Sequence, residues 1–272
     1  MRAWMAVVLC SAVAVAGCGK VEDRPSEVDA QGDPGDARVD DGPGDASVGD
    51  AAAGDAPGSD APAKPPIPDR VLVSGNAQTV TGATQQPCPC VLELIEGGTR
   101  VLARTNADAA GSFVMTVPTG GEPVDVEVTA EADTSLGLFA AHFAFAAPLL
   151  ADRSVDLKLL DTAAFQRLQG AAGEPTSTQR SLVIVHVLDA NGRSLSGATV
   201  AIDQAGIAVH YGDGAGQPVP VPTRTTTAGD GLAFLFNASS RPTITVTSPG
   251  ATFAPRPLSV AARNTYTLEV AP

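Results

Sequence analysis

Two cysteines placed two positions apart carry the clearest chemistry in this chain. Cys88 and Cys90 stand in the segment PCPC, and in an extended segment both side chains point to the same face. Free thiols, a disulfide between molecules and a disulfide that closes the Cys88-Pro89-Cys90 ring are all open. Two thiolates also suit a soft ion such as Cu(I), but no nearby His, Met or further Cys completes its coordination shell. We predict the local disulfide, with a structural role as a clip at the start of the second strand of the first folded module.

The histidines form no catalytic or metal-binding arrangement. His142, His186 and His210 are isolated, and two of them lie in strand patterns, where a hydrogen-bonded structural role is the ordinary one. The sequence contains no Gly-x-Ser-x-Gly elbow and no His-Glu-x-x-His motif, and the segment GDGAGQPVPVP at 212–222 runs into prolines where a phosphate loop would open a helix. We therefore expect a protein that is not an enzyme, with no catalytic residue, no metal site and no cofactor.

The N-terminal segment has the pattern of an export signal. Residues 1–17 contain one cation at Arg2, an apolar run over 3–15, and small residues at the end of that run. The run is too short to span a bilayer as a permanent helix. Residues 1–17 therefore predict a signal peptide, and export makes oxidation the default state of Cys88 and Cys90.

The end of this segment, Val15-Ala16-Gly17-Cys18, resembles the lipobox of bacterial lipoproteins. The resemblance implies that the Cys18 sulfur takes a diacylglycerol and that the mature chain begins at Cys18. It also implies the outer membrane, facing the periplasm or the surface, because Gly19 stands where inner-membrane lipoproteins tend to have Asp. An ordinary secretory signal with an incidental Cys18 is the alternative.

Residues 18–69 predict a disordered acidic tether. Lys20 to Asp69 hold thirteen acidic and four basic residues, a net charge of −9, among Gly, Pro and Ala. Five of the aspartates recur every fifth residue from Asp40 to Asp60, a period that matches neither the EF-hand loop nor the nonapeptide β-roll of calcium-binding proteins, and a solvated spacer is the interpretation we favour over a calcium site. About fifty residues of such coil reach on the order of 40 Å. The whole chain carries a formal charge of −13 with no basic cluster, which excludes nucleic acid as a partner.

From residue 70 onward the pattern is that of half-buried strands. Phe113, Met115 and Val117 alternate with small or polar residues, and Ala198, Val200 and Ile202 alternate in the same way. Residues 161–178 interrupt the strands as a connector, in which Asp161 can cap one or two helical turns before Gly170 and Pro175 end them. We predict an all-β fold of two β-sandwich domains, 70–160 and 179–272, each of about 90 residues.

One hairpin pattern occurs in both halves of the folded region. RTNADAAGSF and RTTTAGDGLAF align Arg104 with Arg224 and Gly111 with Gly231 at an offset of 120, and Gly supplies the positive φ that such a turn needs. With GATV at 197–200 and the Val-Pro at 117–118, the pattern resembles the carboxypeptidase regulatory-like domain, a transthyretin-like Greek-key β-sandwich. The match is better over 181–270, and the first half departs from it at QPCPCVLEL. The resemblance implies a non-catalytic accessory module.

These observations predict a membrane-anchored lipoprotein whose two modules have a structural or protein-interaction role, with an envelope protein as partner. Glycan binding is the alternative. Sugar sites usually offer an aromatic face, and Trp4 lies in the signal, so only Tyr211 and Tyr266 remain. Tyr266 alternates with Leu268 and is expected in the core, which leaves Tyr211 as the candidate platform.

Replacing Cys18 by Ala is expected to move the protein from the membrane fraction to the soluble fraction. The acidic surface is repelled by anionic lipid, so the acyl chains on Cys18 must supply the anchoring. Immunoblots of the two fractions measure the change, and Cys10→Ala serves as the control that stays with the membrane. Membrane retention of the Cys18→Ala variant would show that the lipid anchor is wrong.

Overall fold

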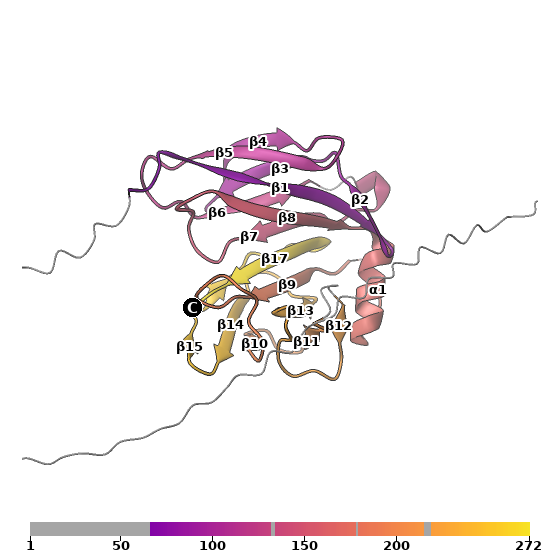
Figure 1. The fold of residues 1–272 in the computed structure, drawn as a ribbon. Coiled ribbons are helices and arrows are strands. Elements are labelled where there is room, and N and C mark those ends of the chain that lie inside the picture. Colours follow the sequence, from indigo (N-terminus) through magenta and orange to yellow (C-terminus); the bar gives the residue numbers. More distant parts are fainter. Residues whose placement is uncertain (1–65, 132–133, 178, 215–218) are drawn as a thin grey trace, which may run out of the picture. The chain divides into compact units, whose positions relative to one another are not determined.

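The computed structural model describes residues 66–131, 134–177, 179–214 and 219–272, and its elements are labelled in Figure 1. The signal peptide, the lipobox residues Val15, Ala16, Gly17 and Cys18, and the tether up to residue 65 lie outside the described residues. Within the described part the chain is all-β, as predicted, with a single α-helix. None of the helices in these ranges is long and apolar enough to cross a membrane.

The strands of residues 70–160, here called module 1, form two facing sheets. They are β1 (Arg70–Thr81), β2 (Thr84–Pro87), β3 (Val91–Glu96), β4 (Arg100–Asn106), β5 (Ser112–Pro118), β6 (Val126–Ala130), β7 (Ala140–Ala144) and β8 (Arg153–Leu160), with a 3-10 turn, η1 (Thr134–Leu136), before β7. In one sheet the first part of β1 pairs with β5 and its last part pairs with β2, both antiparallel. Strand β8 pairs with β1 in parallel on the other side. In the second sheet the order is β4, β3, β6, β7.

The alternating residues of module 1 lie where their pattern predicts. Phe113, Met115 and Val117 of β5 are buried, whereas Val114 between them is 59% exposed. The buried faces of both sheets meet in one apolar cluster that includes Val128 of β6 and residues of β1 and β8. The period of two therefore sets which face of each strand enters the core.

Residues 179–272, here called module 2, repeat this arrangement. The strands are β9 (Leu182–Val187), β10 (Thr199–Ile202), β11 (Val209–Gly212), β12 (Pro220–Val221), β13 (Leu232–Phe236), β14 (Thr243–Ser248), β15 (Ala251–Thr252), β16 (Arg256–Pro257) and β17 (Asn264–Val270). One sheet has the order β12, β11, β13, β9, β17, and the other consists of β10, β14, β15 and β16. Each module thus contains one parallel pair formed by its first and last strands, β1 with β8 in module 1 and β9 with β17 in module 2.

The segment between the modules contains helix α1 (Thr162–Ala172), which is longer than the one or two turns expected. Asp161 is the N-cap, as predicted, and its Oδ1 accepts a hydrogen bond from the Ala164 backbone N–H at 2.6 Å. Gly170, expected to end the helix together with Pro175, lies inside it, whereas Pro175 follows its end. The helix ends instead at Gly173, whose left-handed backbone satisfies the last carbonyl groups, while Phe165 on its buried face stacks against Phe139.

A single nine-stranded sheet runs through both modules, which the sequence does not predict. Strand β17 lies between β9 and β7 and pairs with both in parallel, so the second sheet of module 1 continues into the first sheet of module 2 (Figure 1). Thr267 of β17 stands opposite Phe143 of β7. These two side chains project from the same face of the sheet, and Phe143 enters the core of module 1 there. Tyr266 precedes Thr267 in β17, so it projects from the other face, where it enters the core of module 2. The two cores therefore lie on opposite faces of this sheet.

The two aligned hairpins make the same contact in both modules. The Gly111 carbonyl accepts a hydrogen bond from Ala77 N–H at 2.8 Å, and the Gly231 carbonyl accepts one from Val187 N–H at 2.9 Å. Both glycines have positive φ, 81° and 67°. A Cβ on Gly111 would lie 2.4 Å from the Ala77 carbonyl oxygen, and one on Gly231 would lie 2.5 Å from that of Val187. Gly is required at these turns both for the backbone conformation and for the space.

Gly111→Ala is expected to lower the free energy of unfolding by about 3 kcal/mol, since the positive φ costs about 1–2 kcal/mol and forced overpacking about 1–3 kcal/mol more. Urea unfolding followed by circular dichroism measures the change. Gly192→Ala is the matched control, with φ 74° and open space around the added Cβ, and should lose only about 1–2 kcal/mol. Equal losses in the two variants would contradict the steric role of Gly111.

Candidate functional site: a groove beside strand β8

A groove of about 360 Å³ lies between the outer edge of β8 and the nine-stranded sheet. Its rim is formed by β8 from Ser154 to Leu160, and its floor by side chains of β7, β9, β13 and β17. Leu168 of α1 lines it beside Leu160, where β8 ends. The Arg153 guanidinium and the Glu269 carboxylate form an ion pair at 3.2 Å, and this pair joins the start of β8 to β17. The groove therefore follows β8 over most of its length.

The rim exposes backbone groups that have no strand beside them. The Asp161 N–H donates to the Val80 carbonyl of β1 at 2.9 Å, and the Leu160 carbonyl, which points the other way, accepts from Phe139 N–H at 2.8 Å. Alternate residues of a strand direct their N–H and C=O groups to opposite edges. Three residues of β8 therefore turn both their N–H and their C=O toward the groove: Ser154, Asp156 and Lys158. None of these backbone groups has a backbone partner among the described residues.

The floor of the groove is the face of the sheet that module 2 leaves outside its own core. Phe143, Ile184 and Leu232 supply apolar surface, and Thr267 lies among them. Ile184, Leu232 and Thr267 are half-buried. The Thr265 hydroxyl lines the same groove at 3% exposure and has no hydrogen-bond partner in the described part of the chain. Such a buried orphan group ordinarily costs about 1–3 kcal/mol, so the floor offers both apolar area and an unused polar atom.

His186 lies in the floor near the ion pair. Its Nε2 is 2.9 Å from the Ser194 Oγ, which fixes the ring. Burial lowers the pKa of His186 because desolvation penalises the charged ring, and the nearby carboxylates of Glu269 and Asp230 oppose this with a smaller effect. The ring is therefore neutral at pH 7.

The other two histidines have fixed structural partners. His142 of β7 has its Nδ1 2.5 Å from Glu127 Oε1 and its Nε2 2.9 Å from the Asn264 amide, and its ring stacks on Tyr266. His210 of β11 has its Nε2 3.0 Å from Glu174 Oε1. No group of three or more His, Cys, Asp or Glu side chains is placed to hold a metal ion within the described ranges.

Tyr211 is not the exposed platform that the glycan alternative requires, and that prediction is wrong. Its side chain is 3% exposed, and its hydroxyl accepts a hydrogen bond from the Val200 backbone N–H at 3.0 Å. Tyr211 belongs to β11, whose pairing with β13 turns the ring into the core of module 2. Tyr266 is buried as expected. No tyrosine of the folded region therefore offers a stacking face to a sugar.

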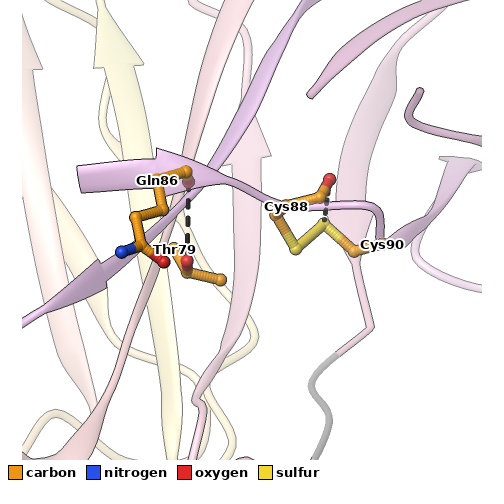
Figure 2. The surroundings of a disulfide bond; sticks show 4 residues. All are labelled: Thr79, Gln86, Cys88 and Cys90. Carbon is orange, nitrogen blue, oxygen red and sulfur yellow. Dashed lines mark hydrogen bonds between the residues drawn. A yellow bond between two sulfur atoms is a disulfide. The ribbon is translucent and has the colours of Figure 1, made fainter. Parts of the chain in front are cut away.

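Cys88 and Cys90 are joined by a disulfide in the structure, with their Cα atoms 5.2 Å apart (Figure 2). The Cys88 carbonyl oxygen lies 3.3 Å from the Cys90 Sγ, a contact and not a hydrogen bond, because a disulfide sulfur carries no proton. The ring precedes the third strand, β3, and not the second, because the sequence gives no separate signal for the short β2.

This ring lies where the chain leaves the sheet of β1 and enters that of β3. The Cys88 N–H donates to the Ala77 carbonyl, and the Cys90 carbonyl accepts from Ala107 N–H, both at 2.9 Å. Beside the ring, the Thr79 hydroxyl bonds to the Gln86 carbonyl of β2 at 3.4 Å (Figure 2). The position suits a clip at the crossing between the two sheets of module 1.

No known protein family matches the chain, and no curated protein matches it. Among solved structures it is similar to the Bacillus anthracis TIE protein, with 12% identity and a TM-score of 0.23 over 74% of this chain and 34% of the other. The chain thus spans about a third of that protein. It is also similar to the shaft pilin SpaA from Lactobacillus rhamnosus GG (11% identity, TM-score 0.25, 75% and 98% covered) and to GBS52, the minor pilin of Streptococcus agalactiae (7%, 0.25, 74% and 94%). Similarity at this level carries no argument about function.

Mass spectrometry of the unreduced, alkylated protein is expected to find Cys88 and Cys90 unlabelled and joined within one peptide. Export to an oxidising compartment, which residues 1–17 predict, would favour the bond, and the short ring keeps the two sulfurs together. A reduced sample, which should take two labels, is the control. Two labels in the unreduced sample would show that the ring does not exist, and a cross-link between two copies of the peptide would show intermolecular pairing.

Below about pH 6.5 we expect His186 to reduce the stability of the fold. Because the folded pKa is lowered from 6.5, the unfolded chain takes up its proton first, so stability that is present above pH 6.5 is lost as pH falls through the folded pKa. Urea unfolding between pH 5 and 8 should show a flatter pH dependence for His186→Gln than for the natural chain. Val114→Thr changes no titratable group and should keep the pH dependence of the natural chain. If the free energy of unfolding of His186→Gln depended on pH as steeply as that of the natural chain, His186 would not be the group responsible.

Proposed function

We propose that the chain is a bacterial lipoprotein that is anchored through Cys18 and that binds a protein partner of the cell envelope through its β-sandwich modules, without catalysis. The observation that carries this proposal is the groove beside β8, where unpaired backbone groups of Ser154, Asp156 and Lys158 stand next to apolar floor side chains. Such a combination of apolar area and aligned hydrogen-bonding groups suits a polypeptide better than a small metabolite.

The residues around the groove do not assemble a reaction centre. His186 is held by Ser194 and kept neutral by burial, and the Ser154 hydroxyl, the one hydroxyl of the rim, lies on an exposed strand face. Asp156 and Lys158 follow each other at alternate positions of β8 and project from the same face of that strand. The side chains of these rim residues do not form a nucleophile with an adjacent base.

The tether gives this binding role its reach. A lipid on Cys18 followed by an acidic tether of about fifty residues would let the modules sample positions on the order of 40 Å from the membrane. A binding module with that reach can engage a partner held in the same membrane or in a neighbouring layer of the envelope. The placement in the outer membrane belongs to this proposal.

Thr267→Arg is expected to abolish capture of the partner from an envelope extract, because the long charged side chain would occupy the floor of the groove. The full-length protein serves as bait, and captured proteins are quantified by mass spectrometry. Val114→Arg is the matched control, since Val114 is an exposed β5 residue outside the groove lining, and it should capture as much as the natural chain.

Unchanged far-UV circular dichroism and urea midpoints would establish that both variants are folded. A bait that enriches no protein, or a Thr267→Arg bait that enriches the same protein to the same degree as Val114→Arg, would exclude the groove as the binding site.

A further inference from the structure

We infer that the groove binds an extended segment of another protein, which adds to the sheet of β1 as a new strand beside β8; this rests on the proposed function and specifies its binding mode. The two modules repeat the same arrangement of strands. Ala77 of β1 and Val187 of β9 make equivalent hydrogen bonds to Gly111 and Gly231, so β1 corresponds to β9. Their parallel neighbours, β8 and β17, correspond to each other in turn.

The corresponding edges are occupied differently. The outer edge of β17 is covered by β7, which pairs with it in parallel from Asn264 to Leu268. The outer edge of β8 has no strand beside it among the described residues. The edge that is covered by a strand in module 2 is therefore uncovered in module 1.

The groove continues an existing interface between strands. Phe143 of β7 and Thr267 of β17 stand opposite each other in the paired sheet, and both line the groove floor. A strand beside β8 would lie above them at the spacing of about 10 Å that separates packed sheets. Side chains of alternate residues would then face Ile184 and Leu232, while the others face solvent.

The backbone of β8 provides the hydrogen bonds. The N–H and C=O groups of Ser154, Asp156 and Lys158 all point toward the groove. A new strand can therefore pair with β8 from Ser154 to Lys158. An incoming segment satisfies these groups through its own backbone, so its affinity depends little on the identity of its polar side chains. Its apolar residues at alternate positions give the selectivity.

A second copy of this chain does not supply the strand by the same geometry. In module 2 the counterpart of β7 is β16, which pairs with β14 as β7 pairs with β6. Pro255 and Pro257 flank Arg256 there, and proline has no backbone N–H to donate. The acidic tether is also a poor strand, because it has few branched apolar residues. The occupant is therefore an alternately apolar and polar segment of a different protein.

The experiment compares Asp156→Pro with Asp156→Ala in the full-length protein. Proline at 156 removes an N–H that points into the groove and leaves the β1 ladder intact, as is usual for proline on edge strands. Alanine removes the carboxylate and keeps the N–H. The probe is a synthetic peptide with the sequence of residues 137–147, GLFAAHFAFAA, which contains the strand that covers β17, with two added lysines for solubility. A scrambled peptide of the same composition is the control.

Hydrogen exchange and fluorescence titration give the readouts. We expect the probe, and not the scrambled peptide, to slow amide exchange in β8. We expect Asp156→Pro to weaken binding about tenfold or more and Asp156→Ala by less than about twofold. No binding of the probe at about 1 mM, binding without protection of β8, or an equal loss in both variants would overturn strand addition.

The same two variants separate this inference from the proposed function. If Asp156→Pro captures the envelope partner as well as Asp156→Ala does, while Thr267→Arg captures none, the groove binds a protein but not as an added strand. If the natural chain captures nothing, the proposed function fails as well. A concentration-dependent dimer that Asp156→Pro abolishes would identify a second copy as the occupant and overturn the choice of a foreign partner.

Discussion

Parallel pairing between β7 and β17 is the interaction on which the rest of the folded region depends. Each sandwich would by itself expose an edge strand at this position, with a row of unpaired backbone groups. The pairing removes both edges at once and turns two sheets into one sheet of nine strands. Contacts around the junction support it, since the His142 ring stacks on Tyr266 and the Arg256 guanidinium donates to the Phe145 and Ala146 carbonyls at 2.9 and 2.6 Å. A change at this junction therefore acts on both modules.

The groove is a consequence of this shared sheet. The two cores lie on opposite faces of the nine-stranded sheet. The four-stranded sheet of each module therefore covers only half of one face of that long sheet, and a step is left where each four-stranded sheet ends. On the module 1 side, helix α1 covers one end of the step with Phe165, and the Arg153–Glu269 ion pair crosses the other. The uncovered middle combines half-buried apolar residues with an unpaired strand edge. In a soluble fold such an edge is ordinarily blunted by charges, and Asp156 and Lys158 have that effect here until a strand arrives.

The histidines of the folded region are held by fixed surroundings. His142 and His210 are each fixed by a carboxylate, and burial keeps His186 neutral. The Thr265 hydroxyl has no partner in the described part of the chain, and an incoming backbone group could satisfy it. The disulfide ring lies elsewhere, at the crossing between the sheets of module 1, and concerns the stability of that crossing.

The sequence by itself determines the local features, because these depend on neighbours along the chain. The alternation of Phe113, Met115 and Val117 sets the buried face of β5, and Asp161 marks the start of α1. The equivalence of Gly111 and Gly231 is likewise readable, since positive φ and a close carbonyl admit only glycine. Only the tertiary structure decides that β7 pairs with β17, because two edges more than a hundred residues apart meet through the packing of whole modules. The burial of Tyr211 follows from the pairing of β11 with β13, and the free edge of β8 follows from the strand order of its own sheet. No local pattern encodes which edge of a strand remains uncovered.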